Sequence, residues 1–377
     1  MKNELCLGEI SFYWRMKSAL EDSNDGVPEF LPFSFHFNTS LGLLQQKYSC
    51  LVSETLESVY AKDENVGYLQ DGHDLAELYS SDFLNFLEES LDLRAFKGKN
   101  LLEVGCGGCY LLNKLKSIGF KVFGCDPSPV SLVAGKKNNI DIVSEFYGGS
   151  VISSKFDMIV HYDVLEHIYD PIGFLKQHRV NLNTNGYIAF AVPDCTEAIT
   201  RGDISMILHE HVNYFSASSL KSTVEASGFE IIALRKGDKV GTLHCVAKVS
   251  EKPFIKSRYD EVFDFNDFLG KFEINKETIS TWLDIEDVGI YIPLRAIPYL
   301  CIDNRFSGIR FFDDNTDLHG KFFDGFNIDV ESFDDLIRNP PKRILVFSYV
   351  FGELIRKKIL SHAKCELEIF TLEDLEQ

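Results

Sequence analysis

The stretch LLEVGCGGCYLL, residues 101–112, decides the fold of this chain. A short apolar run that favours a buried strand leads into Gly105, Gly107 and Gly108, and leucines at helical spacing follow from Leu111. Glycines at a strand-to-helix junction let the backbone turn sharply and bring its N–H groups close to a bound small molecule. The stretch therefore predicts a ligand-binding loop.

The residues around this loop alternate strand and helix patterns from about 100 to 250. Short apolar strands are expected at 100–105, 121–126, 140–146, 156–165 and 187–193, with a closing hairpin at 229–236 and 241–249. Helical patterns separate them. This alternation predicts an α/β fold whose parallel sheet is covered by helices on both faces.

The 377 residues suggest two or three domains. Residues 1–90 are less regular and are expected to form an N-terminal cap that binds substrate. Residues 91–250 form the predicted sheet domain. A second strand-and-helix pattern over 251–377 predicts a smaller C-terminal α/β domain.

Two acidic residues characterise the loop as a cofactor site. Glu103 lies two positions before Gly105, where a carboxylate suits a cationic amino group better than a pyrophosphate. Asp126 ends the next strand, where an acidic side chain can accept hydrogen bonds from both ribose hydroxyls. A glycine-rich turn of another nucleotide-binding protein, such as an NAD-dependent oxidoreductase, is the alternative interpretation.

Together, Glu103, Gly105, Gly107 and Asp126 resemble motif I and the acidic loop of class I methyltransferases that use S-adenosylmethionine (SAM). SEFYGG at 144–149 corresponds to the adenine-flanking segment of that family, and FDMIVHYDVLEHIYDP at 156–171 to its fourth strand. The resemblance implies a Rossmann-like methyltransferase sheet with SAM as cofactor. The implied cofactor-binding residues are Glu103, Gly105, Gly107, Asp126, Pro127, Phe146, Tyr147 and Tyr162.

The segment LHEHVNYFSASSL, residues 208–220, follows the fifth strand, where an open α/β sheet presents its ligand crevice. Because an imidazole titrates near neutral pH, His211 could remove a proton from a substrate. Glu210 could orient His211 or polarise a hydroxyl. A hydrogen-bonded polar turn without catalytic function is the alternative.

This segment resembles the EHxxYFS stretch of the sugar C-methyltransferases of deoxysugar biosynthesis. The resemblance implies that His211 and Glu210 are at the active site. Leu208 replaces the tyrosine that these relatives carry, so its hydroxyl would have to come from elsewhere, with Tyr68 and Tyr79 as candidates.

His167 is a second candidate for positioning the substrate or sharing proton transfer, although it could equally be a structural histidine. His209 and His161 could face the crevice, and neither is given a catalytic role.

The resemblance extends to residues 309–330 and the segment after them, which are similar to the small C-terminal domain of the same family. Two departures are visible. Only Cys6 and Cys50 precede residue 100, so the family's zinc-binding cysteines are missing and we expect no metal. A glycine-rich turn of the family is replaced by Tyr291, Pro293 and Arg295, which puts a ligand role of that turn in doubt.

The hypothesis is methyl transfer from SAM to a carbon beside a keto group of a small molecule, a nucleotide-linked sugar, through an enolate. Three alternatives stay open: an O- or N-methyltransferase acting on a sugar or another small metabolite, a SAM-binding protein without turnover, and an NAD-dependent oxidoreductase. The sequence does not identify the oligomeric state.

Composition argues against several partners. A net charge of -19 repels nucleic acid and anionic membrane surfaces. No apolar run approaches the roughly 20 residues that cross a bilayer, and no signal peptide is visible, so we expect a cytoplasmic protein. The nine scattered cysteines fit a reducing compartment. A redox function of the Cys106–Cys109 pair is left as an alternative.

Overall fold

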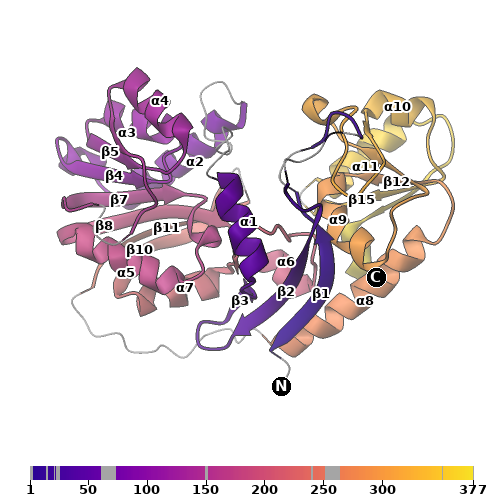
Figure 1. The fold of residues 1–377 in the computed structure, drawn as a ribbon, viewed down its shortest axis with the longest axis horizontal. Helices are drawn as coiled ribbons and strands as arrows, with labels where there is room; N and C mark the ends of the chain where they lie inside the picture. Colours follow the sequence, from indigo (N-terminus) through magenta and orange to yellow (C-terminus); the bar gives the residue numbers. More distant parts are fainter. Residues whose placement is uncertain are drawn as a thin grey trace.

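The computed structural model describes residues 3–13, 16–20, 22, 26–60, 74–148, 152–238, 241–250, 264–349 and 351–376. Three sheets make up these parts of the chain. Figure 1 shows the largest sheet at the left, the C-terminal sheet at the right, and strands β1 and β2 between them.

The central sheet has seven strands in the order β10-β11-β8-β7-β4-β5-β6. Strands β4 to β8 run parallel, while β11 pairs antiparallel with β8 and with β10. This is the predicted Rossmann-like sheet with its closing hairpin. The strands span Asn100–Val104 (β4), Lys121–Cys125 (β5), Asp141–Val143 (β6), Phe156–Tyr162 (β7), Leu182–Pro193 (β8), Phe229–Lys236 (β10) and Thr242–Val249 (β11).

Helices cover both faces of this sheet, as its apolar strands require. Successive residues of a strand point to opposite faces, so Leu101 packs with α2 and α3, and Leu102 packs with α5 and α7. Ser216 caps α7 with a reciprocal hydrogen-bonded box. The helices are α2 (Asp74–Ser90), α3 (Tyr110–Ile118), α4 (Pro129–Asn138), α5 (Pro171–Asn181), α6 (Thr196–Arg201) and α7 (Ala217–Ala226).

The N-terminal region is more regular than its sequence indicates. Strands β1 (Glu4–Ser11), β2 (Phe30–Asn38) and β3 (Leu43–Gln46) form an antiparallel sheet, followed by helix α1 (Cys50–Tyr60). The fourth strand, β9 (Asn213–Tyr214), comes from the HEHVNY segment and pairs with β3. The N-terminal sheet is therefore joined directly to the segment that carries His211.

The C-terminal region contains five parallel strands in the order β14-β13-β12-β15-β16. The order reverses between β12 and β15, which in such sheets marks the edge where ligands bind. The elements are α8 (Phe265–Leu283), β12 (Val288–Tyr291), α9 (Pro293–Ile302), β13 (Ile309–Phe312), β14 (Val330–Glu331), α10 (Phe333–Arg338), β15 (Arg343–Val346), α11 (Gly352–His362) and β16 (Glu368–Thr371).

One apolar core joins the N-terminal sheet, the segment after β8 and the C-terminal sheet. It includes Phe35 of β2, Ile204 after α6, and Leu300 of α9. Helix α9 also packs on β1, where the Ser11 N–H donates to Cys301 Sγ at 3.4 Å. None of the helices in the described ranges is long and apolar enough to cross a membrane.

Candidate active site

The loop Gly105–Cys109 connects β4 to α3 and makes the sharp turn that the sequence predicts. Gly105 has φ of 71°, and a Cβ placed on it would lie 2.6 Å from Cγ2 of Val164. Gly107 also has positive φ, and so does Cys109, which precedes α3. Both backbone conformation and close contact therefore require glycine at position 105.

Asp126, which follows strand β5, forms hydrogen bonds with this loop. Its Oδ2 accepts a hydrogen bond from the Gly107 N–H at 2.8 Å, and its Oδ1 accepts one from the Ser128 N–H at 2.8 Å. The side chain is buried. The carboxylate thus lies directly beside the loop, at the end of β5 where the sequence places it.

Glu103 is the buried carboxyl group beneath the loop, with 2% of its surface exposed. Burial raises the pKa of Glu103 well above its usual value, and Cys109 and Asp126 raise it further. Its Oε2 has no hydrogen-bond partner among the described residues. An amino group of a bound cofactor would supply the missing partner, so Glu103 and the glycine turn fit SAM.

The other predicted cofactor residues lie at the ends of neighbouring strands. Pro127 follows Asp126 and β5, the exposed Phe146 follows β6, and Tyr162 ends β7 and is covered by α2. Tyr147 instead packs on α5, where its hydroxyl donates to Asn181 Oδ1 at 2.9 Å.

Two segments that are distant in sequence meet beside this edge of the sheet. The turn Leu165–His167 follows β7, and its Glu166 carbonyl accepts a hydrogen bond from the Val212 N–H at 2.7 Å. The Asn213 side chain donates to the carbonyls of Leu165 and Ile168, at 2.9 and 2.7 Å. These bonds hold the HEHVNY segment against the turn after β7.

This arrangement brings together the three catalytic candidates. The rings of His167 and His211 are 5.0 Å apart between centroids. His167 Nδ1 lies 2.8 Å from the Glu210 carbonyl oxygen, which can only accept, so Nδ1 carries a proton. Burial lowers the pKa of His211 well below its usual value, and His167 and Arg295 lower it further. At neutral pH His211 is therefore an unprotonated imidazole.

Two carboxyl groups in this cluster were not among the candidates named from the sequence. Glu166 is 1% exposed, and neither of its oxygens has a hydrogen-bond partner within the described chain. Burial raises the pKa of Glu166, and Asp163 and Glu210 contribute. Burial and Glu210 likewise raise the pKa of Asp163 to about 7. The sequence signal that could have selected Asp163 and Glu166 is their position in DVLEH, next to His167.

The cluster also has the groups that a metal ion would need. Glu166, His167 and His211 each offer one ligand atom, and these atoms lie within 4.8 Å of one another. Two imidazoles and a carboxylate are a known zinc ligand set. The expectation of no metal, which rested on the missing N-terminal cysteines, stays a prediction.

A tyrosine hydroxyl reaches the cluster from a residue that the sequence analysis did not select. Tyr60, the last residue of α1, places its hydroxyl 3.4 Å from Glu210 Oε2 and 3.5 Å from His167 Nδ1. Tyr79 packs on Tyr162 instead, with ring centroids 6.0 Å apart. Tyr68 lies outside the described residues.

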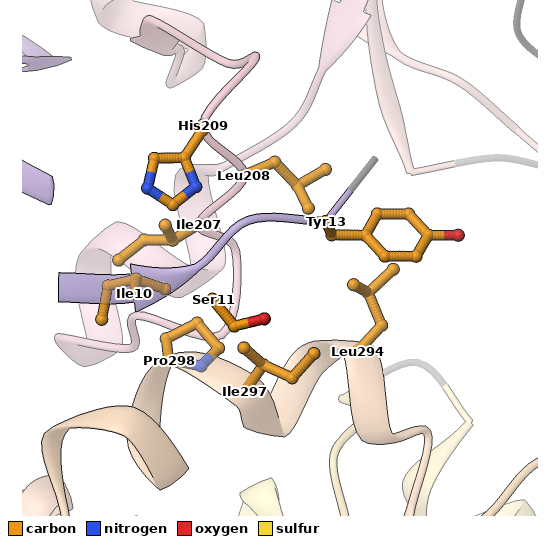
Figure 2. Close-up of a pocket in the computed structure, with 9 residues that line it drawn as sticks. All are labelled: Ile10, Ser11, Tyr13, Ile207, Leu208, His209, Leu294, Ile297 and Pro298. Carbon is orange, nitrogen blue, oxygen red and sulfur yellow. The ribbon is translucent and has the colours of Figure 1, made fainter. Parts of the chain in front are cut away.

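Leu208 and His209 line a small pocket between the end of β1 and α9. Figure 2 shows Leu208 directed toward Tyr13 and Leu294. His209 is buried, and its Nε2 lies 3.1 Å from the Leu31 carbonyl oxygen. His161 is fully buried, with its ring stacked on a phenylalanine of β8. Both of these histidines are packed in the protein interior.

Arg295 is the cationic group that α9 presents near this site. It lies in the first turn of the helix, is exposed, and donates to the Ser205 carbonyl at 3.4 Å. Among the residues with described positions, no carboxylate forms an ion pair with its guanidinium. The guanidinium is therefore available to an anionic ligand.

Comparison with known proteins agrees with this geometry. A family model described as a methyltransferase domain matches residues 72–234, which include the glycine loop and the His167–His211 cluster. The chain therefore carries a class I SAM-dependent methyltransferase domain, and SAM is its cofactor.

The curated relatives include ubiquinone biosynthesis O-methyltransferases. The mitochondrial protein of Schizosaccharomyces pombe is 30% identical over 151 residues, which are 37% of this chain and 54% of the relative. The protein of Azorhizobium caulinodans is 23% identical and covers 40% of this chain and 66% of the relative. The chain thus spans less than two thirds of each of these relatives.

Solved structures of methyltransferases also match. Magnesium protoporphyrin IX methyltransferase from Synechocystis with bound SAM has a TM-score of 0.42 at 12% identity, covering 54% of this chain and all of that one. An N-methyltransferase from Bradyrhizobium japonicum has a TM-score of 0.39 at 15% identity, covering 53% of this chain and 99% of that one.

Proposed function

We propose that this chain transfers the methyl group of SAM to a carbon atom beside a keto group of a nucleotide-linked sugar, with His211 as the base. The observation that carries the proposal is the half-buried imidazole of His211, whose pKa is lowered, beside His167 and Glu210 at the sheet edge that holds the cofactor loop. Such a base can remove a proton from carbon only when a neighbouring keto group makes that proton acidic.

In this mechanism SAM supplies an electrophilic methyl group on a sulfonium ion. His211 takes the proton from the acceptor carbon, and the electron pair of the broken C–H bond moves toward the keto oxygen. Glu210 and His167 hold the acceptor in line with the cofactor. SAM would supply the methyl group to the acceptor carbon, and His211 passes the proton it has taken to solvent.

The nucleotide part of the proposed acceptor is supported by Arg295. Its guanidinium is exposed in the first turn of α9, donates to the Ser205 carbonyl at 3.4 Å, and contributes to the lowered pKa of His211. A guanidinium is well suited to bind a diphosphate. We also propose that residues 1–90 and 251–377 act as cap and C-terminal domain around a catalytic domain at 91–250.

A second candidate is methylation of a hydroxyl oxygen, because the curated relatives are named ubiquinone biosynthesis O-methyltransferases. His211 would then remove a proton from oxygen. An amine acceptor would use the same base.

The deciding experiment incubates the protein with SAM carrying a ¹³C-methyl group and nucleoside-diphosphate-linked keto sugars, and locates the label by NMR. Label on a ring carbon beside the keto group supports the proposal. Label on oxygen or nitrogen selects the second candidate, and SAM binding without any transfer refutes both.

A further inference from the structure

The proposed reaction needs a group that the catalytic candidates do not supply. Removing a proton beside a keto group moves negative charge onto the keto oxygen, and a positioned hydrogen-bond donor lowers the barrier by stabilising that charge. In the proposed reaction His211 accepts the proton from the acceptor carbon. Around it, Asp163, Glu166 and Glu210 are carboxyl groups, and Glu166 is itself buried.

Tyr60 contributes a neutral hydroxyl to the same cluster from a different part of the chain. Its oxygen is 3.4 Å from Glu210 Oε2 and 3.5 Å from His167 Nδ1. Since the His167 Nδ1 proton is already donated to the Glu210 carbonyl, the phenol proton points to the Glu210 carboxylate. Hydrogen bonds from hydroxyl to oxygen usually measure about 2.5–3.0 Å, so this one is long and easily exchanged for a better acceptor.

The backbone that carries Tyr60 is fixed by packing. Val52, Leu56 and Val59 on the buried face of α1 contact Phe12 and Leu31 of the N-terminal sheet. Tyr60 itself is only half-buried, and its ring meets the His167 ring edge to face with centroids 6.4 Å apart. The hydroxyl is therefore held at the cluster by a packed helix.

We propose that Tyr60 is a catalytic residue whose hydroxyl donates a hydrogen bond to the keto oxygen of the acceptor; this inference rests on the proposed function. As the C–H bond breaks, its proton goes to His211 and its electron pair forms the enolate, whose oxygen Tyr60 stabilises while keeping its own proton. The enolate carbon then bonds to the methyl group, and the pair of the broken sulfur–methyl bond stays on sulfur.

The first test is Tyr60→Phe, assayed with labelled SAM and a nucleoside-diphosphate-linked keto sugar. Loss of one oxyanion donor lowers kcat by about 100-fold, while the Kd for SAM stays within a factor of two. Tyr187→Phe is the matched control, because this tyrosine packs on Phe96 on the covered face of the sheet. Equal kcat in Tyr60→Phe and wild type overturns the inference.

A second measurement separates stabilisation of charge from a purely structural role. Tyr60 is replaced by 3-fluorotyrosine, and exchange of the acceptor C–H with deuterium is followed in the presence of the demethylated cofactor. A more acidic phenol stabilises the enolate better, so exchange should become faster than in wild type. Exchange that does not respond to fluorination overturns the catalytic role, even if Tyr60→Phe is slow.

The two proposals fail in different ways. If wild type and Tyr187→Phe both leave every keto sugar unmethylated at carbon, the proposed function is wrong and the Tyr60 inference falls with it. If both methylate carbon and Tyr60→Phe does so equally well, only the Tyr60 inference is wrong.

Discussion

At the scale of single residues, the proposed chemistry depends most on His211. Replacement of His211 by Asn keeps a similar side-chain volume and removes the proton acceptor, so turnover should fall by at least about 100-fold while SAM binding is unchanged. Isothermal titration with SAM and a methyl-transfer assay measure the two effects. His362→Asn, at the exposed end of α11, is the control. Unchanged turnover in His211→Asn would remove this residue from the mechanism.

Asp126 should affect the binding of SAM. Asp126→Ala removes the acceptor of the Gly107 and Ser128 N–H groups and the carboxylate expected to bind the ribose hydroxyls. We expect the Kd for SAM to rise by about 10-fold to 100-fold, because one or two charge-assisted hydrogen bonds are lost. Asp141→Ala, exposed on β6, is the control. An unaltered Kd would refute the cofactor assignment.

Buried histidines predict how stability responds to acid. Burial lowers the pKa of His209 to about 4, whereas an unfolded histidine titrates near 6.5, so the unfolded chain binds more protons between these values. Stability is therefore lost as the pH falls, by about 2 kcal/mol for this residue between pH 7 and 5. Urea unfolding of wild type and His209→Gln at pH 7 and pH 5 measures the free energy of unfolding of each protein. If this free energy changes equally with pH in both proteins, the prediction is wrong.

At the residue level, the sequence selected candidates where the signal lies within one segment. Glu103, Gly105 and Asp126 were selected because a glycine turn and a strand end are local signals, and the structure places them together. Glu210 and His211 were selected as candidates from one short segment rich in polar side chains, and their catalytic role stays a prediction. Tyr60 was missed because its relation to Glu210 spans 150 residues and depends on how α1 packs, which no local pattern encodes.

At the scale of elements, the β4–α3 turn is the most constrained. Gly105→Ala forces a side chain into a positive-φ conformation and into Val164 Cγ2 at 2.6 Å. We expect weaker SAM binding and destabilisation of about 1–2 kcal/mol from the backbone alone. Val164→Ala should restore part of the loss by removing the contact. Thermal unfolding and SAM titration of the three variants test this, and no rescue would mean that the close contact is not what requires glycine.

Most strands of the central sheet were predictable because they contain short apolar runs that a local pattern identifies. The N-terminal strands were not assembled into a sheet from the sequence. Their last partner is β9, where Gln45 Nε2 donates to Asn213 Oδ1 across 168 residues. Sheet pairings at such separation are settled by tertiary packing and not by local preference.

At the scale of the whole molecule, a buried contact joins helix α9 of the C-terminal region to the segment that follows α6. The Tyr299 hydroxyl of α9 donates to Asp203 Oδ1 at 2.9 Å and accepts from the Ile204 N–H at 3.2 Å. Tyr299→Phe leaves both groups buried without this partner and should cost about 1–3 kcal/mol. Urea unfolding measures the loss. Tyr187→Phe is the control. Surface substitutions usually change the free energy of unfolding by less than about 0.5 kcal/mol, so a difference between the two variants smaller than that would contradict the prediction.

The pairing of β3 with β9 also has a consequence during protein synthesis. The N-terminal strands leave the ribosome about 170 residues before their last partner strand, which at roughly 5–20 residues per second means a delay of about 10–30 s. For that interval the open edge of β3 can pair with another nascent chain. Expression at lower translation rates, or without chaperones that shield strand edges, should therefore reduce the yield of folded protein. The activity of each molecule that does fold should stay unchanged.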